Sequence, residues 1–368
     1  MDPAELRADV PTFDETVYLN TGASGPSPRR VVAAANDCLE RHEFDAPGEE
    51  GMYPFAWDQF DRTRERVAEF VGADPDEIAL TQSTSDGINR VACAIDWEPG
   101  DTVVRTDLEH SAGILPWKRL RDRRGVEVEV VQTDAGRLDL DDLDDALADA
   151  ELLFLSAIDW CYGTELPVAE AVELAHEAGA RVLVDAVQVP GQTTMDVREW
   201  GADYVVAAGH KWLLGPWGAG FVYVDRAAAE ALEPSFVGYR SVEEPMAESY
   251  VFKPGAPRLE VGTTSPGPYA GLRAAMDAIE AVGLDTVERH VERLTDRLKA
   301  GLPDGALLSP REYESGLVSW RVDDAEATVE RLREEGVVLR SLPVDGAVRA
   351  SLHVVNTEED VDRLLGAL

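Results

Sequence analysis

The stretch Asp203–Gly220, DYVVAAGHKWLLGPWGAG, is the most informative part of this sequence. Its apolar run Tyr204–Ala208 predicts a buried strand, which ends in Gly209-His210-Lys211 and a glycine-rich turn. The apolar and aromatic neighbours should desolvate the Lys211 ammonium and lower its pKa. Because a neutral amine can attack an aldehyde to form a Schiff base, Lys211 is a candidate for carbonyl chemistry. The alternative is a lysine that extends from a buried turn to solvent.

The composition limits the partners that the chain can have. Its 368 residues include 71 acidic side chains and 34 basic ones, with a formal net charge of −37. Nucleic acids and anionic membranes bind clustered lysine and arginine, so neither is expected as a partner. Because the carboxylates are spread along the whole chain, we interpret the acidity as a surface adapted to high salt, as in a halophile.

The cysteines and the hydropathy pattern predict a cytoplasmic protein. Cys38, Cys93 and Cys161 have neither the spacing of metal ligands nor a paired pattern, which favours a reducing compartment and no metal site. No apolar stretch is long enough to span a bilayer, and the acidic start MDPAELRADV does not resemble a signal peptide.

A hydroxyl-rich turn before a predicted helix is a candidate anion site. Ile78–Leu80 is predicted to end a strand, Thr81–Gly87 is polar, and an amphipathic helix follows. This order directs backbone N–H groups and the helix dipole at an anion. Ser83, Thr84 and Ser85 add hydroxyl donors, although one of them could simply cap the helix. No Walker-type lysine follows, so a nucleoside triphosphate is not expected.

Two more residues follow predicted strands, at the edge where open α/β sheets bind ligands. His110 comes shortly after the strand Thr102–Thr106 and is either a helix cap or a flat ring that faces a ligand. Asp185 ends the apolar strand Val182–Val184, and a carboxylate there needs a cationic partner. Lys211 follows Asp185 by 26 residues (211 − 185), the length of one αβ unit, so both should lie at adjacent strand ends.

Strands and helices alternate from about residue 78 to residue 224, which predicts a mostly parallel, doubly wound α/β sheet. Residues 233–257 are rich in loops, and Asp45–Pro54 is predicted to be a mobile loop. A helix pair followed by strands and helices indicates a smaller second domain. We therefore expect an N-terminal segment 1–30 that packs on the small domain, a large domain 31–257 and a small α+β domain 258–368.

Together these features match the needs of one cofactor, pyridoxal 5′-phosphate (PLP). PLP requires a turn that binds its phosphate, a side-chain ring that stacks on the pyridine ring, an acid beside the pyridine nitrogen and a lysine for the Schiff base. The acid keeps that nitrogen protonated, so the ring can withdraw electrons from a bound amino acid. Each feature is weak alone, but their order and spacing together favour a PLP site.

The sequence also resembles the class V aminotransferase family, which includes cysteine desulfurases, selenocysteine lyases, kynureninase and isopenicillin-N-epimerase-like proteins. The motifs that carry the resemblance are VLVDAVQ, GHKWLLGPWGAGFVYV, RLEVGTT and VRASLHVVNTEEDVDRL, and the likeness extends from about Val17 to the C-terminus. It implies PLP-dependent fold type I (aspartate-aminotransferase-like), with a mostly parallel seven-stranded sheet and a smaller α+β C-terminal domain.

The resemblance assigns roles to individual residues. Lys211 matches the Schiff-base lysine and proton shuttle, Asp185 the acid on the pyridine nitrogen, and His110 the stacking histidine. These three are the expected catalytic residues. The other expected cofactor contacts are Gln188 at the phenolic oxygen of the ring, Thr84, Ser85 and His210 at the phosphate, and Thr263, which reaches the phosphate from the partner subunit of a homodimer.

On the substrate side, the resemblance places Arg349 at the α-carboxylate of an amino acid, because an arginine fork binds a carboxylate with two parallel hydrogen bonds. The alternative for Arg349 is a surface arginine near a strand. Arg340 and Ser24 are the further expected substrate-binding residues.

The departures from the family pattern affect the expected reaction. Desulfurases carry a catalytic cysteine between the strand that matches Val337–Arg340 and the strand that holds Arg349. Here the interval Ser341–Val348 has none, so ordinary desulfurase activity is not expected. Cys161 lies on a different loop and is expected to be structural. The pair Asp159-Trp160 occupies the place of a family asparagine.

We therefore expect a PLP-dependent enzyme that acts on an α-amino acid, with transamination as the first expectation. A cysteine or cystine C–S lyase, or a desulfurase-like enzyme, without the usual catalytic cysteine is the second, and an epimerase is the third. A scaffold that has lost catalysis is a weak alternative, because Lys211, Asp185 and His110 are all present. A nicotinamide dehydrogenase is remote, since no G-x-G-x-x-G follows a first strand.

Overall fold

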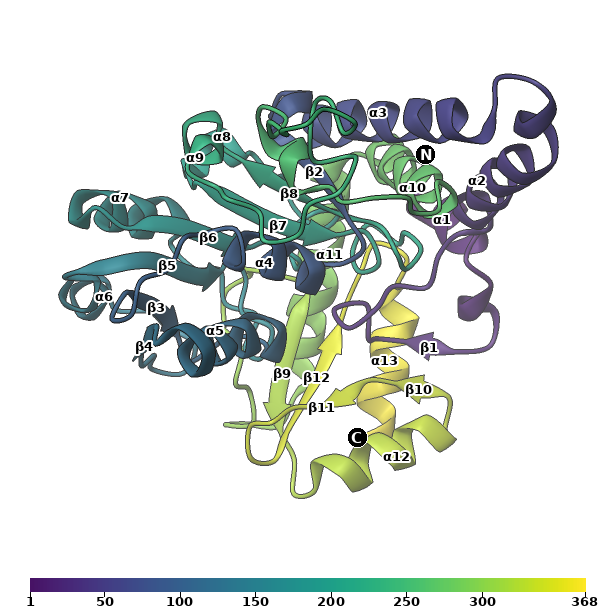
Figure 1. The fold of residues 1–368 in the computed structure, drawn as a ribbon. Coiled ribbons are helices and arrows are strands. Elements are labelled where there is room, and N and C mark those ends of the chain that lie inside the picture. Colours follow the sequence, from purple (N-terminus) through teal and green to yellow (C-terminus); the bar gives the residue numbers. More distant parts are fainter.

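A seven-stranded sheet forms the centre of the computed structural model, which describes residues 1–368 (Figure 1). Strand β8 is antiparallel to both of its neighbours, and the other strands share one direction. The mostly parallel sheet expected from the sequence is therefore confirmed. From edge to edge the strands are β2 (Ile78–Thr81), β8 (Gly220–Val224), β7 (Tyr204–Ala208), β6 (Arg181–Asp185), β5 (Ala150–Ser156), β3 (Thr102–Thr106) and β4 (Glu127–Val131).

Helices cover both faces of this sheet, and its inner strands are therefore apolar almost without interruption. Side chains alternate between the two faces along each strand. In β6, Val182 and Val184 belong to one core and Leu183 to the other. The Leu183 side is covered by α4 (Thr84–Ala92) and α5 (Ser111–Arg124), and the opposite side by α3 (Met52–Val71), α6 (Leu140–Leu147), α7 (Val168–Ala178) and α10 (Gly267–Val282).

The C-terminal part forms a second, three-stranded antiparallel sheet below the first in Figure 1. Its order is β11 (Arg340–Ser341), β12 (Ala347–Ser351) and β9 (Leu317–Arg321). A separate core lies between this sheet and three helices, α11 (Leu284–Gly301), α12 (Ala325–Glu334) and α13 (Glu358–Ala367).

The N-terminal segment joins this smaller unit through a short parallel pair. Strand β1 (Val17–Tyr18) pairs with β10 (Val337–Val338), and Val17 and Leu19 belong to the C-terminal core. Helix α10 instead packs on α2 (Arg29–Glu40) and α3. The domain limits at residues 31 and 258 therefore stay a prediction.

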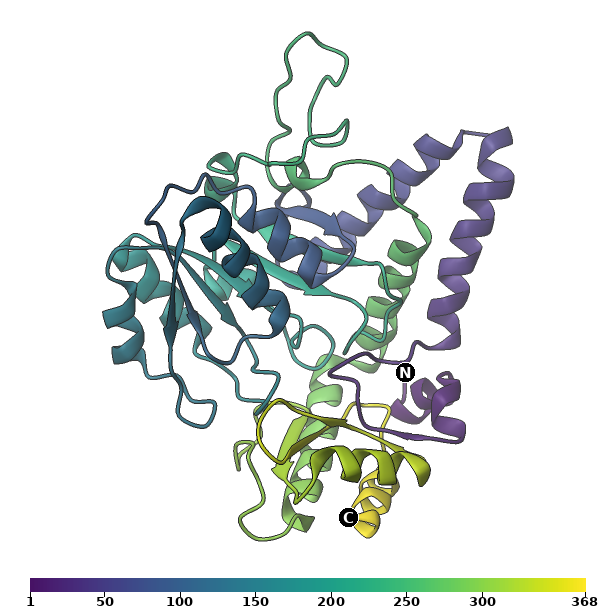
Figure 2. The same cartoon turned by 60° about the horizontal axis from the view of Figure 1, so that its bottom comes forward.

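Two local features of the fold were not predicted from the sequence, and a third was predicted as a loop-rich segment. The segment expected to be a mobile loop is largely helical: the turns η2 (Arg41–Asp45) and η3 (Ala46–Gly48) connect α2 to α3. Lys299 is buried, and its ammonium donates to the carbonyl oxygen of Glu312 at 2.8 Å. The segment between α9 (Arg226–Glu230) and η5 (Ala256–Leu259) extends away from the sheet as a long loop (Figure 2).

Short helices complete the fold. None of the helices combines the length and the apolar character that crossing a bilayer requires. The short helices are α1 (Pro3–Ala8), η1 (Pro11–Asp14), η4 (Pro75–Glu77) and α8 (Val197–Trp200).

Candidate functional site

The carboxyl ends of β5 and β6, the segment after β7 and the start of α4 enclose a cavity of about 180 Å³, which we call the Lys211 cavity. Ligands of open α/β sheets bind at this edge. The cavity brings together residues that are far apart in the chain. Its wall includes Thr84, Ser85, His110, Asp185, Gln188, His210, Lys211 and Arg340, all of which are candidates from the sequence.

Lys211 follows shortly after β7, and its side chain lines the cavity. Burial lowers the pKa of Lys211 to about 8, against the opposing effect of the Asp185 carboxylate. A larger fraction of this amine is therefore neutral near pH 7 than of a free lysine, as addition to a carbonyl requires. The backbone here is held by Gly25, whose N–H donates to the carbonyl oxygen of His210 at 2.8 Å. A Cβ at Gly25 would collide with the carbonyl oxygen of Lys211.

Asp185 ends β6, and its side chain is only 4 % exposed. Its Oδ1 accepts a hydrogen bond from the backbone N–H of Val187 at 2.9 Å, while Oδ2 has no hydrogen bond within the chain. Burial raises the pKa of Asp185, and the Lys211 ammonium opposes that shift. The carboxylate therefore has one oxygen available for a donor inside the cavity.

The first turn of α4 forms a polar end of the cavity. Ser83 is the helix cap, because its Oγ accepts a hydrogen bond from the backbone N–H of Asp86 at 3.1 Å. Thr84 Oγ1 is buried and has no hydrogen-bond partner. An anion at this helix N-terminus would supply the missing acceptor and would interact favourably with the helix dipole.

His110 is both a helix cap and a wall of the cavity, so its two expected alternatives apply together. Its Nδ1 accepts a hydrogen bond from the backbone N–H of Ala112 at 3.2 Å. Burial, assisted by Lys211 and two arginines, lowers the pKa of His110 to about 4, so the ring is neutral at pH 7. The ring meets Trp160 edge to face, with centroids 5.0 Å apart. Burial and Lys211 likewise lower the pKa of His210 to about 4.

Gln188 fixes the N-terminal loop against the cavity. Its Nε2 donates to the carbonyl oxygen of Gly22 at 3.1 Å, and its Oε1 accepts from Trp212 Nε1 at 2.7 Å. Ser24 lies next to the cavity but is not part of its wall. Its Oγ accepts from Trp217 Nε1 at 2.9 Å.

The two arginines that are expected to bind the substrate differ in their access to the Lys211 cavity. Arg340 lines the cavity, whereas Arg349 is absent from its wall and completely buried, which excludes the surface alternative for Arg349. Arg349 Nη1 donates to the carbonyl oxygen of Trp160 at 2.6 Å, while its Nε and Nη2 have no partner. Burial and the charge of Arg340 lower the pKa of Arg349 to about 9, which leaves it cationic at pH 7.

Thr263 does not reach the Lys211 cavity within one chain. It lies on the wall of a separate cavity of about 460 Å³, together with Tyr53, Trp57 and Tyr239. These three aromatic side chains are exposed. The residue expected to act from a partner subunit is therefore located beside an exposed aromatic surface.

Sequence reasoning missed two residues of this site, Trp160 as a contact of His110 and Glu109 as a buried acid. Glu109 Oε1 accepts from Thr106 Oγ1 at 2.8 Å, and its Oε2 accepts from Ser156 Oγ at 2.6 Å. Burial raises the pKa of Glu109 to about 8. It thus ties β3 to β5 directly beside His110. An acid next to a histidine after a strand was the signal available in the sequence.

Cys161 is absent from the wall of the Lys211 cavity but lies on the wall of a neighbouring cavity, together with Trp160 and Tyr162. Its side chain is only 7 % exposed and belongs to a small apolar cluster with Leu342 and Ala347. Burial raises the pKa of Cys161 to about 12, so it remains a thiol near neutral pH.

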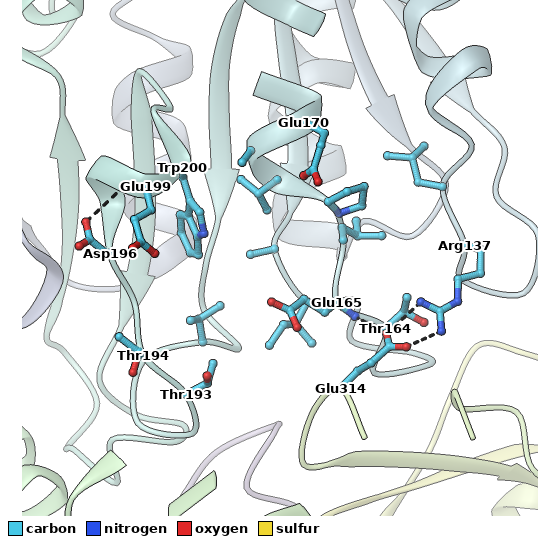
Figure 3. Close-up of a pocket in the computed structure, with 18 residues that line it drawn as sticks. Arg137, Thr164, Glu165, Glu170, Thr193, Thr194, Asp196, Glu199, Trp200 and Glu314 are labelled. Atoms are coloured by element: carbon cyan, nitrogen blue, oxygen red, sulfur yellow. Dashed lines mark hydrogen bonds and ion pairs between the residues drawn. The ribbon is translucent and has the colours of Figure 1, made fainter. Parts of the chain in front are cut away.

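Two larger cavities adjoin the Lys211 cavity. One of about 790 Å³, which we call the vestibule, shares His110, Trp160 and Arg340 with it. The other, of about 640 Å³, shares Ile158 and lies beside α7 and α8 (Figure 3). It has no lysine, and its wall gathers carboxylates, namely Glu165, Glu170, Asp196, Glu199 and Glu314. The vestibule is therefore the cavity of the two that shares more residues with the Lys211 cavity.

Comparisons with known proteins agree with this geometry. The family model described as aminotransferase class-V matches residues 17–364. A probable cysteine desulfurase of Methanothermobacter thermautotrophicus is 33% identical over 100% of this chain and 97% of its own. The apo structure of a cysteine desulfurase from Thermococcus onnurineus NA1 superposes with a TM-score of 0.91 at 30% identity, covering 100% of this chain and 97% of that one. A cystine C–S lyase in complex with its reaction product, cysteine persulfide, superposes with a TM-score of 0.91 at 26% identity, covering 97% and 98% of the two chains.

Proposed function

The chain belongs to the aminotransferase class-V family, and from this premise we propose that it is a PLP-dependent lyase that cleaves the C–S bond of a sulfur-containing amino acid without using a thiol of its own. One observation carries the proposal. The residues that we propose to hold PLP line the Lys211 cavity, whereas the nearby Cys161 is buried and protonated.

The residues present fit PLP. Thr84 Oγ1 at the start of α4 lacks an acceptor, which a phosphate would provide, and Asp185 Oδ2 is available for a pyridinium N–H. The neutral ring of His110 offers a face for stacking. Lys211 has the depressed pKa that attachment to an aldehyde requires. When bound, PLP supplies an electron sink that makes the α-proton of an amino acid acidic.

Within the proposed reaction, the side chains of this protein position the substrate and move its protons. The Lys211 amine takes the proton from Cα, and the departing sulfur is protonated or leaves as a persulfide. Arg349 on β12 holds the α-carboxylate of the substrate. For L-cystine the balance is one molecule of cystine and one of water giving pyruvate, ammonia and cysteine persulfide. No sulfur acceptor on the protein is required.

The named relatives support one candidate reaction better than the other. From the sequence alone, transamination is the first candidate and a C–S lyase the second. The similar proteins are named as cysteine desulfurases and a cystine C–S lyase, which supports the second candidate better than the first. We therefore place the lyase first.

A homodimer remains part of the proposal. It is supported by the position of Thr263 outside the Lys211 cavity of its own chain. The neighbouring side chains Tyr53, Trp57 and Tyr239 are 54%, 47% and 40% exposed, and such contiguous aromatic surface is typical of protein contacts.

The test is sulfide or persulfide release from L-cysteine and L-cystine by protein loaded with PLP in high salt. Lys211→Ala should abolish turnover, whereas Lys118→Ala, which removes a lysine of the exposed face of α5, should retain it. Equal turnover by wild type and Lys211→Ala would contradict the proposed function.

A further inference from the structure

Arg340 and Arg349 are two neighbouring positive charges without an acidic side chain to balance them. They are directly opposite each other in the antiparallel pair of β11 and β12, so their side chains leave the same face of the sheet. Like charges in this arrangement are destabilising. The sole side-chain hydrogen bond of Arg340 goes to the carbonyl oxygen of Ser341, at 3.3 Å. Arg349 contacts the Trp160 carbonyl oxygen alone. Neither arginine has a carboxylate partner within the chain.

One carboxylate is enough to supply the missing hydrogen-bond partners of Arg349. Its Nε and Nη2 are both unpartnered, and these two nitrogens form one edge of the guanidinium, which binds a single carboxylate bidentately. Nη2 lies 3.1 Å from the position that a Cβ on Gly22 would take, and Gly22 lines the Lys211 cavity. The α-carboxylate of a substrate would therefore satisfy Arg349 and leave the charge of Arg340 without a counterion.

Arg340 lies where the Lys211 cavity meets the vestibule, because it lines both. Its guanidinium carbon is 5.3 Å from the centroid of the Trp160 ring, within the range of a cation–π contact that fixes its position. A substrate side chain that leaves the Lys211 cavity for the vestibule must pass this group.

The acidic side chains of the vestibule are engaged elsewhere. Asp107 accepts a hydrogen bond from Thr133 Oγ1 at 2.8 Å, and Glu326 accepts one from Ser341 Oγ at 2.6 Å. The third acid, Glu109, accepts hydrogen bonds from Thr106 and Ser156. None of the three forms an ion pair with Arg340, so the positive charge of Arg340 is available to a ligand.

We propose that Arg340 binds an anionic group at the end of the substrate side chain, while Arg349 binds the α-carboxylate. The preferred substrates are then amino acids whose side chains end in a carboxylate, a sulfinate or an S-sulfonate. This inference rests on one part of the proposed function, namely that the ligand is an amino acid bound in the Lys211 cavity.

The test compares pairs of ligands that have the same shape but differ in side-chain charge. L-aspartate is matched with L-asparagine, and L-glutamate with L-glutamine. Their binding to the PLP-loaded protein is followed by the change in visible absorbance. Because a hydrogen bond to a charged group is worth more than one to a neutral group, each acid should bind roughly 10- to 100-fold more tightly than its amide.

Variants assign this preference to Arg340. Arg340→Gln should remove the difference between acid and amide, and Arg340→Lys should retain part of it. Arg321→Gln is the matched control, because Arg321 is an exposed arginine on β9 of the same sheet, and it should leave the ratio unchanged. Equal binding of acid and amide by the wild type would overturn the proposal. Equal weakening of both by Arg340→Gln would assign Arg340 to the α-carboxylate and would overturn it as well.

The sulfur chemistry is measured separately. Release of sulfur products from L-cysteine sulfinate and S-sulfo-L-cysteine, compared with S-methyl-L-cysteine, distinguishes a sulfinate from an S-sulfonate as the anionic group. A protein that prefers acids to amides but cleaves no C–S bond would refute the lyase and leave the role of Arg340 intact. A lyase without that preference would refute the role of Arg340 alone.

Discussion

Replacement of Cys161 by alanine tests whether the chain contributes a thiol to its own reaction. Burial raises the pKa of Cys161 to about 12. At pH 7.5 roughly 1 thiol in 30,000 is then ionised, against roughly 1 in 10 for a free cysteine of pKa about 8.5. The thiolate is therefore depleted by roughly 3,000-fold. In addition, the side chain packs against Leu342 and Ala347 and lines the vestibule instead of the Lys211 cavity. We expect Cys161→Ala to keep kcat/KM for C–S cleavage within about two-fold of wild type, at a cost of about 1 kcal/mol in unfolding free energy.

The assay is sulfide release from L-cysteine in the presence of a reductant, with mass spectrometry of the protein after turnover. Cys93→Ala, which removes a half-buried cysteine outside the Lys211 cavity and the vestibule, is the control. A loss of more than about ten-fold for a folded Cys161→Ala variant, with Cys93→Ala unaffected, would refute this reasoning. Detection of a persulfide on Cys161 during turnover would do the same.

Four further outcomes are expected. Lys211→Ala should eliminate the visible absorbance of lysine-bound PLP and lower kcat by at least ~100-fold, because the proton shuttle is lost. Asp185→Asn should weaken PLP binding, measured by equilibrium dialysis, by roughly 10- to 100-fold, since an ionised acceptor becomes neutral. Because the pKa of Lys211 is about 8 and the neutral amine is the reactive form, the rate of PLP attachment to apoprotein should rise about ten-fold per pH unit below that pKa and level off above it; a rate independent of pH between 6 and 9 would contradict this. Glu260→Ala should lower the unfolding free energy in urea titrations by about 3 kcal/mol, because the ion pairs of Arg64 and Arg240 with this buried carboxylate are lost.

The sheet and most of the cofactor side of the site could be predicted because their signals are local. The apolar runs at 182–184 and 204–208 lie in strands, and the acid or the lysine that follows each run marks the ligand-binding edge. Asp185 and Lys211 follow neighbouring strands β6 and β7, as their spacing indicated. The order β2-β8-β7-β6-β5-β3-β4 could not be obtained in this way, because strand pairing depends on contacts between distant segments.

The geometry of the proposed substrate-binding arginines also depends on contacts between distant segments, so it could not be predicted from the sequence. The stretch Val337–Arg340 looked like one strand, but β10 pairs with β1 and β11 pairs with β12, so its two ends belong to different sheets. This arrangement brings Arg340 against Trp160, which is 180 residues away in the chain (340 − 160). Arg349 has the apolar neighbours of any buried strand residue, and nothing in its local sequence shows that two of its nitrogens lack partners.

The most direct test of the central claim is the identity of the carbon product that PLP-loaded protein forms from L-cystine in high salt. A C–S lyase that uses Lys211 and no thiol of its own should release pyruvate and ammonia in equal amounts over many turnovers, together with cysteine persulfide. Alanine as the product would indicate desulfuration, and conversion of the bound cofactor to one equivalent of pyridoxamine phosphate would indicate transamination. Either result would contradict a lyase that works without a thiol of its own.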